Sequence, residues 1–495
     1  MFTIDPSQKE AVEALQSGRA VGPTRPLDRI DTHLSHVFLA RDRAYKMKRA
    51  VRMPFVDFST LELRRAACER ELEVNRRFAP RLYLGVRPLT RRPDGAVVVG
   101  GEGEALDWVV VMRRFAAAAL FDDMAARGRL SPALVAEAAE RLASVHTAAA
   151  PADGGGAQDY FAVVSGLRRT DLEGAAAHGL KAGSAALYDA IDVEIDRHEK
   201  LIEQRRREGR VRRGHGDLHL RNICLFEGRA TPFDALEFDP ALATTDVVYD
   251  LAFLLMDLRR RELRRHCNAA MNAWWDAAGE AEGALALLPL FMALRAGVRA
   301  AVSMEAGDAA QAEDYRRLGL SLLKPPPPRL VAIGGLSGSG KSAVAKALAA
   351  DLPGAAGARL LRTDVIRKAG LGPLDADAYD PQRRAEVYRL LTERAAAAFA
   401  AGCPVVADAT FQDAEARRAV EALKPACLWL RAGLGARLVR LAHRKGDASD
   451  ATIEVAAAQA EPDLEPGWTV IDAEAPLADV VARAAAVLGE SPRPT

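Results

Sequence analysis

Two stretches of the sequence hold residue types that phosphate chemistry requires. The first reads RRGHGDLHLRNICLF, residues 212–226, and places Asp217 five positions before Asn222. A carboxylate can orient an attacking hydroxyl, and an amide oxygen can bind a metal ion beside a phosphate. Taken alone, the stretch is also compatible with a polar turn that leads into a strand.

Further carboxylates follow this stretch. The segment ICLFEGRATPF has the pattern of a hairpin, and Asp234 stands just after it, where a second metal-binding carboxylate is expected. Asp250, within DVVYDLAF, supplies one more. In protein kinases a base Asp precedes a metal-binding Asn by five residues, which is the spacing of Asp217 and Asn222. Together these residues favour a phosphoryl-transfer site over a polar turn.

The second stretch, LVAIGGLSGSGKSAVAKAL, contains a glycine-rich loop between a strand-like and a helix-like segment. The glycines let backbone N–H groups wrap phosphates, Lys341 reaches the β- and γ-phosphates, and Ser342 binds Mg²⁺. This is the most specific signal in the chain, and it predicts a site for ATP and Mg²⁺. The predicted phosphate-binding residues are Gly335, Leu336, Ser337, Gly338, Ser339, Gly340, Lys341 and Ser342.

Other polar residues follow the later strands of the same region. Asp408 ends the strand of PVVADATF, which suits a carboxylate beside Mg²⁺ or an ordinary strand-end turn. Asp364 and Arg367 follow the second strand, in RTDVIRK. Arg440 and Arg444 lie on a helix that leads into a polar loop, as in a lid whose arginines close on phosphates, although single helix arginines are often solvated.

Four consecutive prolines divide the chain. Pro325–Pro328 cannot join a helix or a sheet ladder, and such a run forms a stiff segment of about 3.1 Å per residue. We therefore predict a domain at 1–324, a polyproline linker at 325–328 and a domain at 329–495. The last of these alternates strand-like and helix-like segments, which predicts an α/β fold with a parallel, doubly wound sheet.

The region before the prolines has a different pattern. Strand-like segments begin at residues 28–56, and a helix with a Ser59/Glu62 capping box is expected at 59–78. From about residue 120 the pattern is mostly helical. A small strand-rich lobe followed by a larger helical lobe is an α+β arrangement with a ligand cleft between its lobes.

The motifs HGDLHLRN, FDALEFDP and DVVYDLAFL resemble the aminoglycoside phosphotransferase-like (choline kinase-like) branch of the two-lobed protein kinase-like fold. The resemblance covers about residues 28–320. It implies that Asp217 is the catalytic base and that Asn222 and Asp234 bind Mg²⁺. Asp250 would then brace the catalytic loop.

The same resemblance implies nucleotide contacts in the strand-rich lobe. A lysine on the strand RAYKMK should pair the phosphates, and Lys46 fits, with Lys48 as the alternative. Its partner should be a glutamate of the next helix, for which we choose Glu71 over Glu69 and Glu73. The backbone near Met112 should bond adenine. No G-x-G-x-x-G loop precedes Lys46.

The set GLSGSGKS, TDVIRK, DATF, RxxxR and DASDA resembles the small P-loop kinases, which include gluconate kinase-like and zeta toxin-like enzymes with an AAA-type ATP-binding domain. The resemblance covers about residues 329–495. In that group the Asp-x-x-Arg segment faces the acceptor. This implies Asp364 as the base that orients the acceptor and Arg367 as a contact to substrate or phosphate.

The two halves together predict an ATP-dependent phosphotransferase with two ATP and Mg²⁺ sites, each transferring the γ-phosphate to a hydroxyl of an unidentified small molecule. One alternative makes the kinase-like half an ATP-binding regulator of the P-loop half. Another, a nucleic-acid-associated ATPase, rests on the arginine runs at 203–213 and 259–265. These runs lack interleaved aromatic residues, so a nucleic-acid partner is not expected.

The composition fits a cytoplasmic protein. The formal net charge is +1, and the five cysteines form no CxxC pair, which indicates reduced thiols. The N-terminus lacks the pattern of a signal peptide. The longest apolar run, residues 283–294, is too short to span a membrane and predicts a buried helix with Pro289 near its start or at a kink. The oligomeric state is left open.

Overall fold

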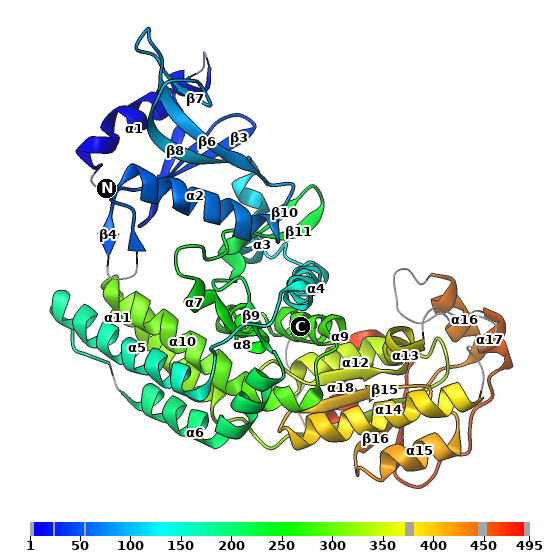
Figure 1. Cartoon of the computed structure of the whole chain (residues 1–495). Helices are drawn as coiled ribbons and strands as arrows, with labels where there is room; N and C mark the ends of the chain where they lie inside the picture. The colour runs from blue at the N-terminus through cyan, green and yellow to red at the C-terminus, as the bar shows by residue number, and fades with distance from the viewer. Residues whose placement is uncertain are drawn as a thin grey trace. The chain divides into compact units, whose positions relative to one another are not determined.

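The structure is a computed structural model that describes residues 4–22, 25–53, 56–183, 185–371, 381–443 and 453–489 (Figure 1). The chain packs into two compact units. Unit 1 comprises Met1–Asp159 and Ile202–Asp257, and unit 2 comprises Tyr160–Leu201 and Leu258–Thr495. Arg444, predicted to belong to a lid, lies outside the described residues.

Unit 1 contains a six-stranded antiparallel sheet with the order β1-β2-β3-β8-β6-β7. Its strands are β1 (Asp28–Asp31), β2 (Ser35–Leu39), β3 (Arg43–Lys48), β6 (Tyr83–Arg91), β7 (Val97–Val99) and β8 (Glu104–Arg113). A separate short ribbon pairs β4 (Arg52–Met53) with β5 (Val56–Asp57). The small strand-rich lobe predicted from the sequence is therefore present.

Helices α1 (Lys9–Gln16) and α2 (Leu61–Arg76) pack against opposite faces of this sheet. Val109 and Val111 of β8 share a core with α1, whereas Val110 and Met112 share one with α2. The same alternation puts Met47 of β3 with α1. The even-numbered residues of β3, which include both lysines, therefore face α2.

The N-cap of helix α2 lies one residue later than predicted. The N-cap is Thr60, whose Oγ1 accepts from the backbone N–H of Leu63 at 3.3 Å. Ser59 instead donates through its backbone N–H and its hydroxyl to Asp57 at 3.0 and 2.6 Å. The predicted Ser59/Glu62 capping box was wrong because Ser59 is already held in this turn.

The rest of unit 1 is mostly helical, as expected, with two small strand pairs. β10 (Ile223–Phe226) pairs with β11 (Arg229–Pro232), and β9 (Val211–Arg213) pairs with β12 (Thr244–Asp246). The helices are α3 (Phe121–Ala126), α4 (Pro132–Ala148) and α7 (Pro240–Ala243), with the 3₁₀ turns η1 (Pro6–Gln8), η2 (Arg19–Val21), η3 (Ala117–Ala119) and η4 (Leu220–Asn222). Three further helices, α5 (Ala157–Ala177), α6 (Ala186–Arg207) and α8 (Val247–Arg260), contribute residues to both units.

Unit 2 contains a five-stranded parallel sheet with the order β14-β15-β13-β16-β17. The strands are β13 (Leu330–Gly334), β14 (Arg359–Arg362), β15 (Val405–Asp408), β16 (Ala426–Arg431) and β17 (Trp468–Asp472). All five were expected from the sequence. The helices of this half are α12 (Lys341–Asp351), α13 (Thr363–Leu371), α14 (Pro381–Ala400), α15 (Ala414–Glu421), α16 (Leu434–Ala442), α17 (Ile453–Ala458) and α18 (Leu477–Val487).

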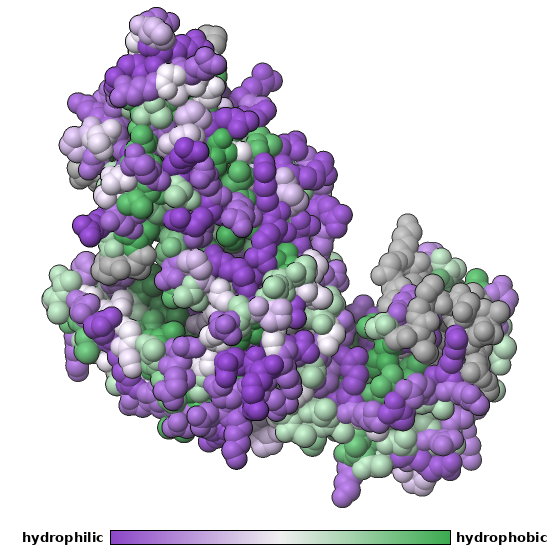
Figure 2. Space-filling model, viewed as in Figure 1, coloured by the Kyte–Doolittle hydropathy of each residue, from purple (hydrophilic) through white to green (hydrophobic). Residues whose placement is uncertain are grey.

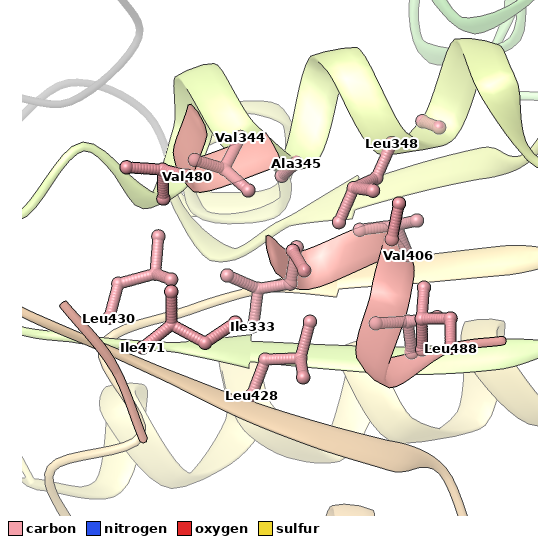
Figure 3. Close-up of a cluster of buried hydrophobic side chains, with 14 of the residues drawn as sticks. Ile333, Val344, Ala345, Leu348, Val406, Leu428, Leu430, Ile471, Val480 and Leu488 are labelled. Atoms are coloured by element: carbon pink, nitrogen blue, oxygen red, sulfur yellow. The ribbon is translucent and has the colours of Figure 1, made fainter. Parts of the chain in front are cut away.

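A core of buried apolar side chains joins this sheet to α12 and α18 (Figure 3). Ile333 and Leu428 of the central strands lie under Val344 and Leu348 of α12, and Val480 adds the contact from α18. The core therefore fixes β13 to α12, and the loop between them is held at both ends. This confirms the predicted parallel, doubly wound fold.

Unit 2 also includes helices that precede the prolines. These are α9 (Arg264–Ala278), η5 (Glu282–Leu287), α10 (Leu288–Glu305) and α11 (Ala309–Leu322). Pro289 stands in the first turn of α10, so it marks a helix start. Glu282–Glu305 is long and apolar enough to cross a membrane, but 72% of its most apolar window is buried in the protein, as in a core helix.

The visible surface is mostly hydrophilic, with hydrophobic residues scattered among polar ones (Figure 2). The large exposed apolar side chains among the described residues include Ile30, Leu172 and Val439. Side chains scattered in this way are normal on a folded protein. The large apolar side chains are instead concentrated in the cores described above.

Candidate active sites

A hairpin brings together the polar residues of the first stretch. β10 and β11 pair from Ile223 with Pro232, so Asn222 and Phe233 meet at the open end of the hairpin. The backbone N–H of Phe233 donates to the backbone oxygen of Asn222 at 2.9 Å. Asp234 is the next residue, and it therefore lies close to Asn222.

Asn222 also contacts the predicted base, Asp217. Its amide nitrogen donates to the backbone oxygen of Asp217 at 2.9 Å and to the carboxylate Oδ2 at 3.1 Å. Because the nitrogen is used in this way, the amide oxygen is the atom that a metal ion can take. The Asp217 side chain is 39% exposed, which leaves room for an acceptor.

Asp250 braces the start of this loop. Its Oδ2 accepts from the backbone N–H of His215 at 2.8 Å, and its Oδ1 accepts from that of Gly216 at 2.7 Å. The Nε2 of His146 lies 2.9 Å from Oδ2. A Cβ on Gly214 would lie 2.3 Å from the same oxygen, so the close approach requires glycine. The structure thus places Asp250 where the resemblance predicted a brace.

Lys46 lies between two carboxylates on the α2 side of β3. Its Nζ is 2.8 Å from Glu71 Oε1 and 2.5 Å from Asp234 Oδ1. Lys48 also pairs with Glu71, at 2.6 Å, but its second partner is Glu237. Of the two lysines that the sequence left open, Lys46 is therefore the one that contacts the predicted metal carboxylate.

Glu71 is the helix residue that meets both lysines. Its side chain is fully buried, whereas that of Glu69 is 52% exposed beside Arg65, and Glu73 is exposed. The pairing predicted between strand lysine and helix glutamate is present in the structure. Burial distinguishes Glu71 from its neighbours because only this residue faces the sheet.

The charges in this cluster support one another. Burial lowers the pKa of Lys46, but the charges of Asp234 and Glu71 raise it by a larger amount, so the pKa lies well above its usual value. Burial raises the pKa of Asp234, and the ammonium of Lys46 lowers it by more, to below the usual range. Both groups are therefore charged at neutral pH.

The oxygen donors at this position fit Mg²⁺. Asp234 offers a carboxylate and Asn222 an amide oxygen, and Mg²⁺ takes such hard ligands together with substrate phosphates and water. In the part of the chain that the structure describes, no three His, Cys, Asp or Glu side chains are grouped to hold a metal.

The segment around Asp234 is held by a residue that the sequence did not reveal. Asn75 of α2 accepts from the backbone N–H of Ala235 at 2.8 Å and donates to its oxygen at 3.3 Å. Asp234 itself has φ of +60°, in the left-handed region that non-glycine residues rarely adopt. Asn75 therefore stabilises a strained backbone at the predicted metal ligand.

The predicted adenine contact at Met112 falls inside the sheet. Met112 is in register with Ala44 on one side and Tyr83 on the other. The next two backbone N–H groups, of Arg113 and Arg114, are also hydrogen-bonded, to Leu82 and Asp42. The backbone N–H groups that follow Met112 are thus used within the lobe, and the adenine contact near Met112 stays a prediction.

The glycines of the P-loop are required by close backbone contacts. Gly338 has φ of +84°, and a Cβ there would lie 2.6 Å from the backbone oxygen of Arg437. Gly335 has φ of +152°, and its Cβ would meet the backbone oxygen of Leu430 at 2.7 Å. Gly340, at φ of +92°, caps α12, whose first residues are Lys341 and Ser342. The strand, loop and helix predicted for a phosphate cradle are all present.

Two arginines of α16 donate hydrogen bonds to backbone oxygens of this loop. Arg437 donates to the Ser337 backbone oxygen at 2.9 Å, and Arg440 donates to the Ser339 backbone oxygen at 3.0 Å and to that of Ala473 at 2.6 Å. Gln459 accepts from the backbone N–H of Ser337 at 2.8 Å. Arg440 therefore lies beside the P-loop with backbone oxygens as its partners, and its contact with phosphates stays a prediction. Arg437 and Gln459 were not anticipated.

Asp408 ends β15 in register with Ile333, next to the start of the P-loop. Its Oδ2 accepts from Arg362 Nε at 3.2 Å, and Oδ1 is buried without a hydrogen-bond partner among the described residues. A buried carboxylate oxygen without a hydrogen-bond donor raises the free energy of the folded state. The orphaned oxygen therefore fits a position beside a cation, as the prediction of a metal-binding Asp408 requires.

Asp364 and Arg367 lie on α13, which begins directly after β14. Tyr388 of α14 lies near Asp364, since the Asp364 charge helps burial to raise the pKa of the Tyr388 phenol. The Tyr388 hydroxyl also pairs with Thr410 Oγ1 at 3.0 Å and accepts from the backbone N–H of Phe411 at 3.2 Å. Sequence spacing did not indicate Tyr388, because the tertiary packing of α14 brings its hydroxyl to Thr410 and Phe411.

The sequence model of the AAA domain family matches residues 330–462. A curated relative, the uncharacterized protein Rv2004c of Mycobacterium tuberculosis, is 31% identical over 462 residues, which cover 88% of this chain and 89% of the relative. The chain belongs to the family of Rv2004c. The match covers 88% of this chain and therefore includes parts of both halves.

Solved structures to which parts of the chain are similar include a Janibacter sugar kinase and a choline/ethanolamine kinase family protein of Mesorhizobium loti. The first is 24% identical and covers 34% of this chain and 97% of its own, with a TM-score of 0.27. The second is 15% identical and covers 64% and 96%, with a TM-score of 0.40. The P-loop half, which the AAA domain model matches at residues 330–462, agrees with the predicted enzyme class, a kinase.

The two lysines of β3 should respond differently to the same substitution. Lys48→Met leaves the buried Glu237 without its partner and should destabilise the fold by about 3 kcal/mol. Lys46→Met leaves Asp234 with access to solvent and should cost less stability while weakening nucleotide binding in unit 1. Urea unfolding and hydrogen exchange of β3 peptides with Mg–AMP-PNP measure the two effects. Equal stability losses would contradict this assignment.

Stability should fall at acid pH through His215. Burial lowers the pKa of His215 despite the nearby carboxylates of Asp250 and Asp217. The unfolded chain therefore binds a proton below about pH 6.5 that the folded chain does not, so the free energy of unfolding falls as the pH drops. His215→Gln should reduce this slope between pH 7 and 5 by up to about 1.4 kcal/mol per pH unit. An unchanged slope in urea titrations would contradict a neutral His215.

Substituting Gly338 should disable the P-loop. Gly338→Ala places a Cβ against the Arg437 backbone oxygen, and the loop must shift. Gly402→Ala is the control, because Gly402 has a similar φ of +80° but nothing within 4 Å of its Cβ. Mg–AMP-PNP should protect peptides of residues 335–342 from hydrogen exchange in the wild type and in Gly402→Ala, but not in Gly338→Ala. Equal protection in all three chains would refute the close contact.

Proposed function

We propose that the protein is an ATP-dependent phosphotransferase with two ATP and Mg²⁺ sites, one in the kinase-like half and one at the P-loop. Each would transfer the γ-phosphate to a hydroxyl of a small molecule. The observation that carries this proposal is the pairing of Lys46 with both Glu71 and Asp234. A kinase-like half that only bound ATP as a regulator would need this cluster too, but it would not need the accessible Asp217 carboxylate beside Asn222.

At the kinase-like site the residues divide the work by position. Asp217 would accept the proton of the acceptor hydroxyl, since its carboxylate is accessible and steadied by the Asn222 amide. Asn222 and Asp234 would hold Mg²⁺, which would neutralise charge on the phosphates. Lys46 would exchange part of its contact with Asp234 for a phosphate oxygen while Glu71 keeps it in place.

At the P-loop site the chain supplies a phosphate cradle from Gly335 to Ser342. Lys341 would contact the β- and γ-phosphates, and Ser342 and Asp408 would hold Mg²⁺. Asp364 would orient the acceptor, with Arg367 beside it. A cavity of 670 Å³ next to the loop, lined among others by Leu336, Gly433, Arg437 and Gln459, is large enough for part of a nucleotide or an acceptor.

Two single substitutions test whether both sites turn over ATP. Asp217→Asn should abolish transfer at the kinase-like site and leave the P-loop site active, and Lys341→Ala should do the reverse. Each variant is therefore expected to retain part of the ATP turnover, and the double variant to retain none. Turnover should be followed with pools of sugars, sugar acids and amino alcohols as acceptors.

The regulator alternative predicts a different pattern. If Lys341→Ala removed all turnover while unit 1 still bound Mg–AMP-PNP, the kinase-like half would be an ATP-binding regulator. Loss of all turnover in either single variant would contradict two independent sites. Thermal unfolding of each variant serves as the control for folding.

A further inference from the structure

The outer edge of the P-loop sheet is completed by side chains of α9, a helix that precedes the prolines. β14 is the last strand of the sheet, and an edge strand leaves one row of backbone N–H and C=O groups without a strand partner. Asn272 accepts from the backbone N–H of Leu360 at 2.8 Å and donates to the Ala358 oxygen at 3.1 Å. One side-chain amide thus makes the two bonds that a neighbouring strand would make.

Asn268, one turn earlier on α9, extends this pairing. Its amide nitrogen donates to the backbone oxygens of Ala356 and Ala358 at 2.9 and 2.8 Å. Gly357 lies between them at φ of +78°, and a Cβ there would stand 2.8 Å from the same nitrogen. The backbone leading into β14 is therefore shaped to receive the α9 side chains.

A buried arginine fixes the strand to the same surface. Arg359 of β14 is completely buried and donates to Asn272 Oδ1 at 2.9 Å and to Glu282 Oε2 at 3.0 Å, and it pairs with Asp276. Arg394 of α14 donates to Glu282 from another side at 2.6 Å. We call Asn268, Asn272, Asp276 and Glu282 the α9 patch.

The strand held by this patch leads directly into predicted catalytic groups. Three residues after Arg359 stands Arg362, in register with Asp408 and bonded to it. Asp364 follows two residues later, at the start of α13. On its inner side, the backbone N–H of Arg359 donates to the Pro404 oxygen at 2.8 Å. A shift of β14 would therefore move Arg362 and Asp364 together, while the P-loop on β13 would stay in place.

We propose that Asn272 and Arg359 are positioning residues of the P-loop site, and that the α9 patch is an integral part of that site's scaffold. The inference rests on the proposed phosphotransferase function of the P-loop half. The patch sets the register of β14, and through it the places of Arg362 and Asp364 relative to Asp408. The functional P-loop unit then begins before the prolines, at α9.

The test uses the full-length chain with Asp217→Asn, in which turnover arises at the P-loop site. Adding Asn272→Leu should lower kcat for ATP turnover by about tenfold, because misplaced groups cost rate even when they do no chemistry. The affinity for Mg–AMP-PNP should change less than twofold, since β13 and the P-loop stay in place. Asn272→Asp keeps the acceptor for Leu360 and should recover part of kcat.

The matched control is Arg316→Met. Arg316 is also a buried arginine of unit 2, paired with Asp171 at 2.5 Å, and it lies on α11 rather than at β14. The substitution Arg316→Met should lower the thermal midpoint of unfolding and leave kcat unchanged. Hydrogen exchange should show peptides of residues 356–362 losing protection in Asn272→Leu and keeping it in Arg316→Met.

The outcomes separate the possibilities. An unchanged kcat in Asn272→Leu, or equal losses of kcat in Arg316→Met, would overturn the positioning role. Unchanged protection of residues 356–362 would overturn the α9 patch itself. A parent Asp217→Asn chain that neither binds Mg–AMP-PNP at the P-loop nor turns over ATP would refute the proposed function, and the positioning role with it.

Discussion

A buried charge must be neutralised, and this requirement organises both candidate sites. Taking an ammonium or a carboxylate out of water costs several kcal/mol unless an opposite charge and hydrogen bonds replace the solvent. In the kinase-like half, Lys46 and Lys48 share Glu71 and are completed by Asp234 and Glu237. In the P-loop half, Arg362 meets Asp408. The partners come from different elements, so the charges can be satisfied only when the sheet, helix and loop are in register.

The two sites also use strained backbone in comparable places. Asp234 has φ of +60°, and Phe411, three residues after Asp408, has φ of +45°. Such conformations persist when neighbouring groups hold them. Asn75 does this beside Asp234, and the Tyr388 hydroxyl does it beside Phe411. In both halves a polar side chain from a helix thus fixes the loop that follows a strand, next to a predicted metal-binding carboxylate.

The connection between the halves is closer than the proline run implies. Pro325–Pro328 lie between α11 and β13, which agrees with a change of fold at that point. The helices α9, η5, α10 and α11 nevertheless pack within the same compact unit as the P-loop sheet. Asparagine amides on α9 replace a missing strand, and Arg359 buries its charge among acids that stand before the prolines in the chain. Chain order and packing thus give different divisions of the protein.

The sequence by itself determined what depends on local order: the P-loop, the Asp217 and Asn222 spacing, the hairpin before Asp234, and the five parallel strands. These follow from short-range patterns, because glycine, alternating apolar residues and turn residues act within a few positions. Only the tertiary structure decided that Lys46 rather than Lys48 meets Asp234, that Glu71 is the buried glutamate, that Thr60 caps α2, and that Asn75, Tyr388 and the α9 patch hold the sites. The Thr60 cap was decided by a local competition, because Asp57 already holds Ser59 in a turn. The others depend on contacts that folding makes between separate elements, and such contacts leave no periodic signal in one sequence.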